Sequence, residues 1–148
     1  MGTETRPGDV TAYAASELIH LPRSRVWALL TDFTAAPLWL TGVTEMHADG
    51  PLGAGVDVDV HVGNRVRTHT VSGFIPEREL CISAGDGDVH TTYAYRLSDS
   101  GDDTLLELAI DVVVSEALQA EAAGIRASVA VDEDGQLVRF RRYAELAP

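Results

Sequence analysis

Apolar and polar residues alternate with a period of two through the middle of the chain, which is the pattern of β-strands with one buried face. The clearest example runs from Val56 to Val62, where every second residue is valine and the residues between are Asp57, Asp59 and His61. Similar segments, bounded by turn-forming residues, occupy residues 13–21, 43–48, 66–74, 80–84, 89–97 and 106–114. Because the connections between successive strands are short, we predict a curved antiparallel sheet of about seven strands.

Two short helices are predicted after the first strand, where the period changes to that of a helix. Pro22 suits the first turn of a helix, because its missing N–H has no partner there in any case. Apolar residues follow at helical spacing, namely Val26, Leu29, Leu30 and Phe33. A second helix is expected over about residues 36–40, so that the two helices form a corner carrying Trp27 and Trp39.

The C-terminal segment predicts a long helix from about Ala117 to Leu146. One stripe of this helix is apolar and consists of Leu118, Ala122, Ile125, Val129, Leu137, Phe140 and Ala144. Such a stripe would cover the apolar face of the sheet, so the chain reads as an α+β fold with a sheet wrapped around a helix.

A β-hairpin over residues 128–141 is the alternative for this segment. Apolar residues flank the polar turn at residues 132–135, and Gly124 and Gly135 each disfavour a helix by roughly 1 kcal/mol relative to alanine. We favour the helix and leave open that it is kinked or interrupted at Gly135.

Composition bounds the class of protein. The 148 residues suit one domain, expected over residues 11–148 after a disordered tail at residues 1–10. The net charge of −12 argues against nucleic acid and anionic membrane surfaces as partners, since both attract basic proteins. No apolar run approaches the ~18 residues that a membrane span needs.

Cys81 is the only cysteine of the chain, so no internal disulfide can form. It lies between Leu80 and Ile82 and is expected to be a small, at least half-buried apolar residue. Nothing points to an oxidising compartment, and no signal peptide is recognisable, so a cytoplasmic location is predicted.

Several motifs point to one protein family. They are Pro22-x3-Val26-Trp27-x4-Asp32-Phe33-x5-Trp39, Gly53-Ala54-Gly55, Phe74-Ile75-Pro76 and Tyr93-Ala94-Tyr95-Arg96-Leu97. In this order they resemble the START/polyketide cyclase (SRPBCC) superfamily, which has the helix-grip fold and includes plant pathogenesis-related allergens. The resemblance covers about residues 12–146, and it implies a cavity between the sheet and the C-terminal helix.

The resemblance implies three functions. The first is binding of a small hydrophobic molecule such as a lipid, an aromatic compound or a polyketide. The second is a cofactor-free cyclase, aromatase or dehydratase that works in the same cavity, and the third is a co-chaperone-like interaction module. The fold alone does not choose among them, and a homodimer is left open.

Aromatic and apolar residues are the candidates for ligand contact. Tyr93 and Tyr95 lie two residues apart on one strand and share a face, so both are expected to point toward the helix as cavity residues or as packed core residues. Trp39 is a candidate at the mouth of the cavity, whereas Trp27 is expected to pin the first helix to the sheet. Ile110, Ile125 and Val129 complete the predicted ligand-binding set.

His69 is the best candidate for a general acid or base, because only imidazole titrates near neutral pH without perturbation. Its position depends on the turn at Gly63-Asn64. A two-residue loop pairs Val62 with Arg65 and places Arg67 and His69 on the apolar face, whereas a three-residue loop pairs Val62 with Val66 and exposes them. We favour the three-residue loop, which keeps the apolar sides together. Tyr93 and Tyr95 are the other weak catalytic candidates.

No metal site is predicted. Asp57, Asp59 and His61 share one face of their strand, but a solvated outer face explains them. The spacing of His20, His47 and His90 shows no convergence on a common point. The sequence also contains no nucleophile elbow, phosphate-binding loop, zinc spacing or dinucleotide fingerprint.

Overall fold

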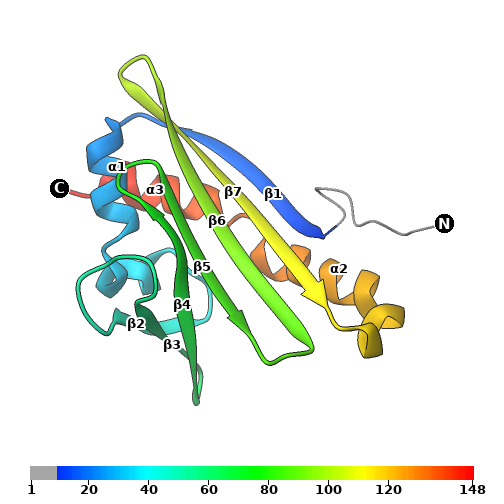
Figure 1. The fold of residues 1–148 in the computed structure, drawn as a ribbon. Coiled ribbons are helices and arrows are strands. Elements are labelled where there is room, and N and C mark those ends of the chain that lie inside the picture. The colour runs from blue at the N-terminus through cyan, green and yellow to red at the C-terminus, as the bar shows by residue number, and fades with distance from the viewer. Residues whose placement is uncertain (1–9) are drawn as a thin grey trace.

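The structure is a computed structural model that describes residues 10–148, so the predicted disordered tail lies, except for Val10, outside the described residues. Seven strands form one antiparallel sheet in the order β1-β7-β6-β5-β4-β3-β2. Their bounds are β1 Thr11–Ile19, β2 Val43–Ala48, β3 Asp57–Val62, β4 Arg65–Ile75, β5 Glu79–Gly85, β6 Val89–Ser100 and β7 Asp103–Val114. The predicted meander is confirmed, and β1 extends it by pairing with β7 (Figure 1).

The helical corner after β1 consists of α1 (Arg23–Leu30) and the 3-10 helix η1 (Phe33–Leu38). Pro22 is the N-cap residue of α1, in an extended conformation one position before the helix. Both helices turn apolar residues inward, and the buried ones are Val26, Leu29, Leu30, Phe33 and Ala36. The second helix therefore starts earlier than predicted and has the tighter 3-10 geometry.

The C-terminal segment is helical, as favoured, and the alternative hairpin does not form. The 3-10 helix η2 (Glu116–Glu121) leads into α2 (Ala122–Glu133), which is followed by α3 (Gln136–Leu146). Both α-helices lie across one face of the sheet (Figure 1). The helix is interrupted beside Gly135, the possibility that the sequence left open, because Asp134 is extended at ψ 135° and Gly135 is left-handed at φ 80°. Glycine adopts that conformation without the steric conflict of a Cβ atom.

We expect Gly135→Ala to lower the free energy of unfolding by about 1–2 kcal/mol, the cost of placing an L-residue in the left-handed region. Gly124→Ala is the matched control, since Gly124 lies inside α2 and a Cβ there would have nothing within 4 Å. It should raise the same free energy by about 0.5–1 kcal/mol. Urea denaturation of both variants measures the two changes, and a destabilised Gly124→Ala or a neutral Gly135→Ala would contradict this description of the break.

The two C-terminal α-helices contribute unequally to the core. From α3, Leu137, Phe140 and Ala144 are at most 1% exposed and pack against the inner face of the sheet. From α2 only Ala122 is fully buried, while Ile125 and Val129 are half-buried. Because α2 fills little of the space beneath it, the fold keeps room for a cavity on that side.

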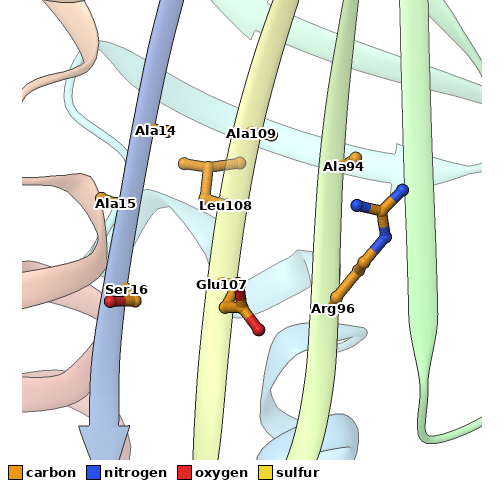
Figure 2. Close-up of a pocket in the computed structure, with 8 residues that line it drawn as sticks. All are labelled: Ala14, Ala15, Ser16, Ala94, Arg96, Glu107, Leu108 and Ala109. Atoms are coloured by element: carbon orange, nitrogen blue, oxygen red, sulfur yellow. The ribbon is translucent and has the colours of Figure 1, made fainter. Parts of the chain in front are cut away.

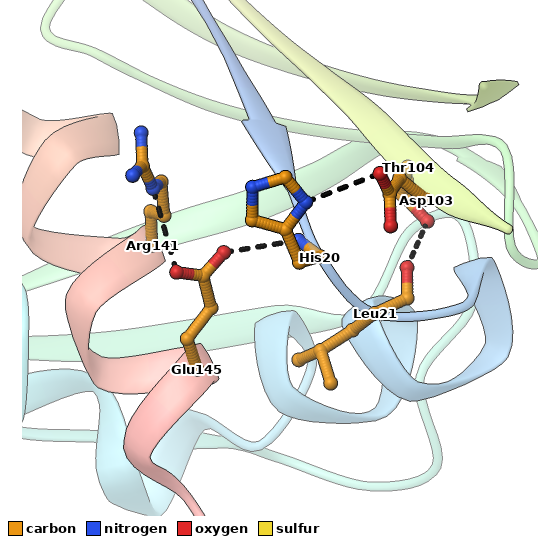
Figure 3. A network of polar contacts seen from close by, with 6 residues as sticks. All are labelled: His20, Leu21, Asp103, Thr104, Arg141 and Glu145. Carbon is orange, nitrogen blue, oxygen red and sulfur yellow. Dashed lines mark hydrogen bonds and ion pairs between the residues drawn. The ribbon is translucent and has the colours of Figure 1, made fainter. Parts of the chain in front are cut away.

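A polar network holds the C-terminal end of α3 against the sheet (Figure 3). Glu145 accepts a hydrogen bond from the backbone N–H of His20 at 2.9 Å, and Arg141 lies 3.5 Å from the same carboxylate. The His20 ring contacts Asp103 at 3.1 Å, and Thr104 donates to the carbonyl of Leu21 at 2.8 Å. These contacts join the C-terminal end of α3 to the end of β1 and the start of β7.

The turn between β3 and β4 has two residues, and the favoured three-residue register was wrong. Val62 pairs with Arg65, leaving only Gly63 and Asn64 in the loop. Gly63 has φ 60° and Asn64 has no positive φ, which fits a type II′ turn with glycine at its first central position. This turn matches the twist of the strands, and its geometry prevails over the apolar pattern. Arg67 therefore pairs with Val60, and the following inward residue is His69.

A candidate ligand cavity between the sheet and the C-terminal helices

A cavity of about 570 Å³ lies between the inner face of the sheet and the helices α2 and α3. This volume falls within the range of pockets that bind small molecules, roughly 300–1,000 Å³. Its lining consists of Leu40, Thr41, Val43, Met46, Val60, Val62, Arg67, His69, Ile82, Ala84, Asp86, Val89, Thr91, Tyr93, Tyr95, Val129, Asp132, Glu133, Gln136 and Arg139.

Strands β2, β3 and β5 supply an apolar wall. Met46, Val60 and Ile82 are each less than 9% exposed and turn their side chains to the inner face. The alternation of valine with aspartate along β3 explains this wall, since successive residues of a strand point to opposite faces. The wall can bury an apolar ring or chain.

Polar groups enter the same cavity from β6 and from the break between α2 and α3. Tyr93 donates a hydrogen bond from its hydroxyl to Glu133 at 3.2 Å, and Tyr95 donates to the side-chain oxygen of Gln136. Gln136 in turn donates to Glu133 at 2.6 Å. The four side chains form one hydrogen-bond network. This network gives the side-chain amide of Gln136 hydrogen-bond partners although the residue is only 1% exposed.

Tyr93 and Tyr95, the two tyrosines of this hydrogen-bond network, remain protonated at neutral pH. Burial, followed by the nearby Glu133 carboxylate, raises the pKa of Tyr93 above its ordinary value. Complete burial, followed by the same carboxylate, raises the pKa of Tyr95 well above its ordinary value. The two hydroxyls therefore act as hydrogen-bond donors, and neither is suited to take up a proton as a base.

Arg67 and His69 bring a cation and an imidazole to the cavity from β4. Burial, aided by the positive charge of Arg67, lowers the pKa of His69, while a hydrogen bond with the Arg67 carbonyl opposes the shift. That contact joins Nδ1 of His69 to the carbonyl oxygen at 3.4 Å, so Nε2 of the neutral ring is left with a lone pair. Within residues 10–148, the Arg67 guanidinium has no ion-pair partner.

Sequence comparison decides the family of a protein with this architecture and cavity. Residues 11–145 match the family described as "Polyketide cyclase / dehydrase and lipid transport". The chain belongs to that family. No match was found among curated protein sequences.

Solved structures with the same fold include two aromatase/cyclases. The di-domain aromatase/cyclase StfQ of the steffimycin biosynthetic pathway superposes with a TM-score of 0.71 at 8% identity, covering 92% of this chain and 50% of that one. The Zhui aromatase/cyclase of Streptomyces sp. R1128 gives 0.64 at 19% identity, with coverages of 90% and 92%. Ara h 8.0201 gives 0.64 at 10% identity, with coverages of 89% and 95%. The predicted helix-grip fold is confirmed.

The cavity of this family member contains some of the predicted ligand residues and not others. Tyr93, Tyr95 and Val129 line it. Trp39 lies beside it in the core, where its ring contacts those of Tyr95 and Phe140 at centroid distances of 6.4 and 4.8 Å. Ile110 is fully buried in the core, and Ile125 packs on Val112, Val114 and Ala122 in a second apolar cluster. Trp27 packs on Phe74, as expected for a residue that pins α1 to the sheet.

Sequence reasoning missed the polar helix residues of the cavity, namely Asp132, Glu133, Gln136 and Arg139. The signal was present, because Glu133 and Gln136 flank the glycine that interrupts an otherwise apolar stripe. Arg139 fixes the break by donating to the carbonyl of Asp134 at 3.2 Å and to that of Trp39 at 3.3 Å. Glu133, Gln136 and Arg139 thus turn toward the cavity together on the two sides of the break.

A second hollow, of about 310 Å³, lies on the outer face of the sheet (Figure 2). It forms because Ala14, Ala94 and Ala109 are small and lie side by side on β1, β6 and β7. Among residues 10–148, both C-terminal α-helices lie on the opposite face of the sheet (Figure 1).

Cys81 also lies on the outer side of the sheet, paired with Ala94. It is half-buried, as expected, and burial raises the pKa of its thiol. A thiol with a raised pKa is a poor nucleophile at neutral pH.

Among the described residues, no helix is both long and apolar enough to span a lipid bilayer.

Proposed function

We propose that the protein binds a small hydrophobic molecule that carries polar oxygen atoms in the cavity between the sheet and the C-terminal helices. The observation that supports this most directly is the composition of the cavity. Met46, Val60 and Ile82 offer an apolar wall, while Arg67 and Glu133 offer charged groups at other parts of the same lining.

We expect polar substituents on the ligand because a bound ligand removes water from charged side chains of the cavity. A purely aliphatic chain would displace water from Arg67 and Glu133 without replacing the hydrogen bonds, and such burial costs several kcal/mol. A ligand with carbonyl or hydroxyl oxygens would accept from Arg67 and donate to Glu133 while its rings contact the apolar wall. An aromatic or polyketide-like compound meets both demands better than a simple fatty acid does.

Native mass spectrometry with a ligand panel tests this proposal. The panel contains fatty acids, unsubstituted aromatic hydrocarbons and hydroxylated aromatic ketones of matched size. We expect one molecule bound per chain, with the hydroxylated ketones retained most strongly. Equal retention of hydrocarbons and ketones would contradict the polar recognition, and retention of none of the three classes would contradict the proposal itself.

Catalysis of a carbonyl cyclisation is the second candidate function, favoured by the neutral His69 next to Arg67. In this reaction the His69 imidazole takes a proton from a carbon beside a carbonyl, and the C–H electrons form an enolate whose oxygen charge Arg67 stabilises. The enolate carbon then bonds to a second carbonyl carbon, and the protonated His69 returns its proton to the new alkoxide. The chain has no lysine, so a lysine imine plays no part.

His69→Asn separates the two candidate functions. If the cavity is catalytic, the variant should bind hydroxylated ketones as the parent does but form cyclised product at least about 100-fold more slowly, the low end of general base contributions. Product formation is followed by liquid chromatography with mass detection. Unchanged product formation in the variant would contradict the role of His69, and absence of product from both proteins would leave binding as the function.

Stability should also depend on pH through His69. Its pKa is lower in the folded protein than the ordinary value of about 6.5, so the unfolded chain takes up the proton first as pH falls. The contribution to stability is therefore lost below about pH 6.5. His69→Asn should show a smaller loss of stability than the parent between about pH 7.5 and 5.5, measured by urea denaturation.

A further inference from the structure

Four side chains with metal-binding groups meet on the outer face of the strand pair β2–β3, opposite the cavity. In the register of these strands Glu45 is paired with His61, and His47 with Asp59. Glu45 and His47 are two residues apart on β2, and Asp59 and His61 are two residues apart on β3. All four side chains therefore point to the same side of the sheet. Sequence reasoning saw no convergence for His47, because the pairing of β2 with β3 is what brings it to His61.

The distances within this group suit a single ion. One ligand atom each from Glu45, His47 and His61 lie within 4.8 Å of one another. A tetrahedral ion with bonds of about 2.0–2.1 Å needs its ligand atoms about 3.4 Å apart. These side chains are exposed or half-exposed, so shifts of their ligand atoms by about 1 Å bring the separations down to the value that the ion needs. Nδ1 of His47 is already 3.6 Å from Oε1 of Glu45.

His47 also has the support that metal-binding histidines usually have. Its second nitrogen, Nε2, lies 3.4 Å from Oδ2 of Asp59. Asp59 is itself oriented by a hydrogen bond from Thr68 at 3.2 Å. A carboxylate on the far nitrogen fixes the tautomer and the ring orientation and makes the other nitrogen a better ligand. The groups that orient His47 are therefore already in place on β3 and β4.

The charge around the group favours a cation. Asp57 accepts a hydrogen bond from Thr70, and Asp59 one from Thr68, so threonine hydroxyls and not arginines face these two carboxylates. Glu45 adds a third carboxylate on the same surface. A divalent ion would offset the repulsion among them, and the chain as a whole has a charge of −12.

We propose that Glu45, His47 and His61 bind one transition-metal ion of the zinc type, with Asp59 positioning His47. Two imidazoles and one carboxylate are ligands that suit zinc better than magnesium or calcium, which prefer oxygen alone. The ion would join the edge strand β2 to β3. The opposite face of this strand pair carries Met46 and Val60, so the ion would also hold one wall of the cavity in place.

Calorimetric titration of zinc into metal-free protein without a histidine tag tests the site. We expect one ion per chain, and a visible absorption band on replacement with cobalt that reports imidazole coordination. His47→Ala and His61→Ala should each weaken zinc binding by more than tenfold, about 1.4 kcal/mol. The exposed His90→Ala on β6 is the matched control and should bind as the parent does.

Two further variants keep the proposal falsifiable. Asp59→Asn should weaken zinc binding about 10–100-fold, as the loss of a carboxylate that orients a metal-binding histidine does, while the cobalt band persists at higher metal concentration. Asp49 belongs to a different group with His47 and Asp59, and Asp49→Asn should leave the affinity unchanged. Loss of binding in Asp49→Asn with retention in His61→Ala would overturn the proposed ligand set. Absence of zinc binding by the parent would overturn the site.

Discussion

Replacing Ala84 with tryptophan is expected to abolish binding of hydrophobic molecules in the cavity. Ala84 lies on the inner face of β5, paired with Thr91, and both residues line the cavity. An indole at this position would extend into the space that we assign to the ligand. The loss of contact should weaken binding by at least about 100-fold, or roughly 2.8 kcal/mol, in native mass spectrometry or calorimetry.

The same substitution on the other face of the sheet is the control for this prediction. Ala14 is exposed and lines the outer hollow on β1, so Ala14→Trp adds the same side chain without reaching the cavity. Binding should be unchanged in this variant. A loss of binding in Ala14→Trp but not in Ala84→Trp would place the ligand on the outer face and contradict the assignment of the cavity.

Replacing Phe140 with alanine should lower the free energy of unfolding by about 3–5 kcal/mol, the largest effect on stability that we expect from one substitution. The ring of Phe140 is completely buried, and it contacts Trp39 at a centroid distance of 4.8 Å and Tyr143 at 6.2 Å. Its loss would leave a hole between α3, η1 and the sheet. Because small proteins are stable by only about 5–15 kcal/mol, the variant should be close to unfolding.

Urea denaturation measures this loss, and Leu146→Ala on the same helix is its control. Leu146 is 85% exposed, so its truncation should change the free energy of unfolding by less than about 0.5 kcal/mol. Equal effects of the two substitutions would contradict the placement of α3 in the core.

The sheet, the helical corner and the helical C-terminus could be predicted because local pattern and tertiary structure agree there. The valines of β3 face inward and alternate with outward-facing polar residues, as the sequence indicates, and Val58 and Val60 are buried. Leu137, Phe140 and Ala144 of the predicted stripe are the residues that α3 buries. In these elements burial of the apolar face contributes most to stability, and the spacing of apolar residues along the chain reveals that face directly.

The register of β4 could not be predicted because two physical effects oppose each other. The apolar pattern favoured pairing Val62 with Val66, which would have placed Arg67 and His69 in solvent. The glycine at the start of the two-residue turn favours the other register, and the polar residues are tolerated because the inner face encloses a cavity there. Polar residues on a strand face that the pattern predicts to be apolar thus indicate a binding site.

The sequence left the helix break at Gly135 open and missed the approach of the surface histidines, because both depend on the tertiary structure. Gly135 ends α2 in a conformation that its neighbours stabilise, since Tyr13 accepts a hydrogen bond from its backbone N–H at 3.3 Å. Tyr13 is 122 residues away in sequence. Similarly, His47 and His61 approach each other only when β2 pairs with β3.

The position of a bound ligand, measured by nuclear magnetic resonance, tests the central claim most directly. Intermolecular nuclear Overhauser effects would be recorded between the best-retained hydroxylated ketone of the panel and the methyl groups of the protein. The cavity assignment predicts contacts to the methyl groups of Met46, Val60 and Ile82, which line it. Contacts to Ala14, Ala94 and Ala109 of the outer hollow, with none to the inner three, would contradict it.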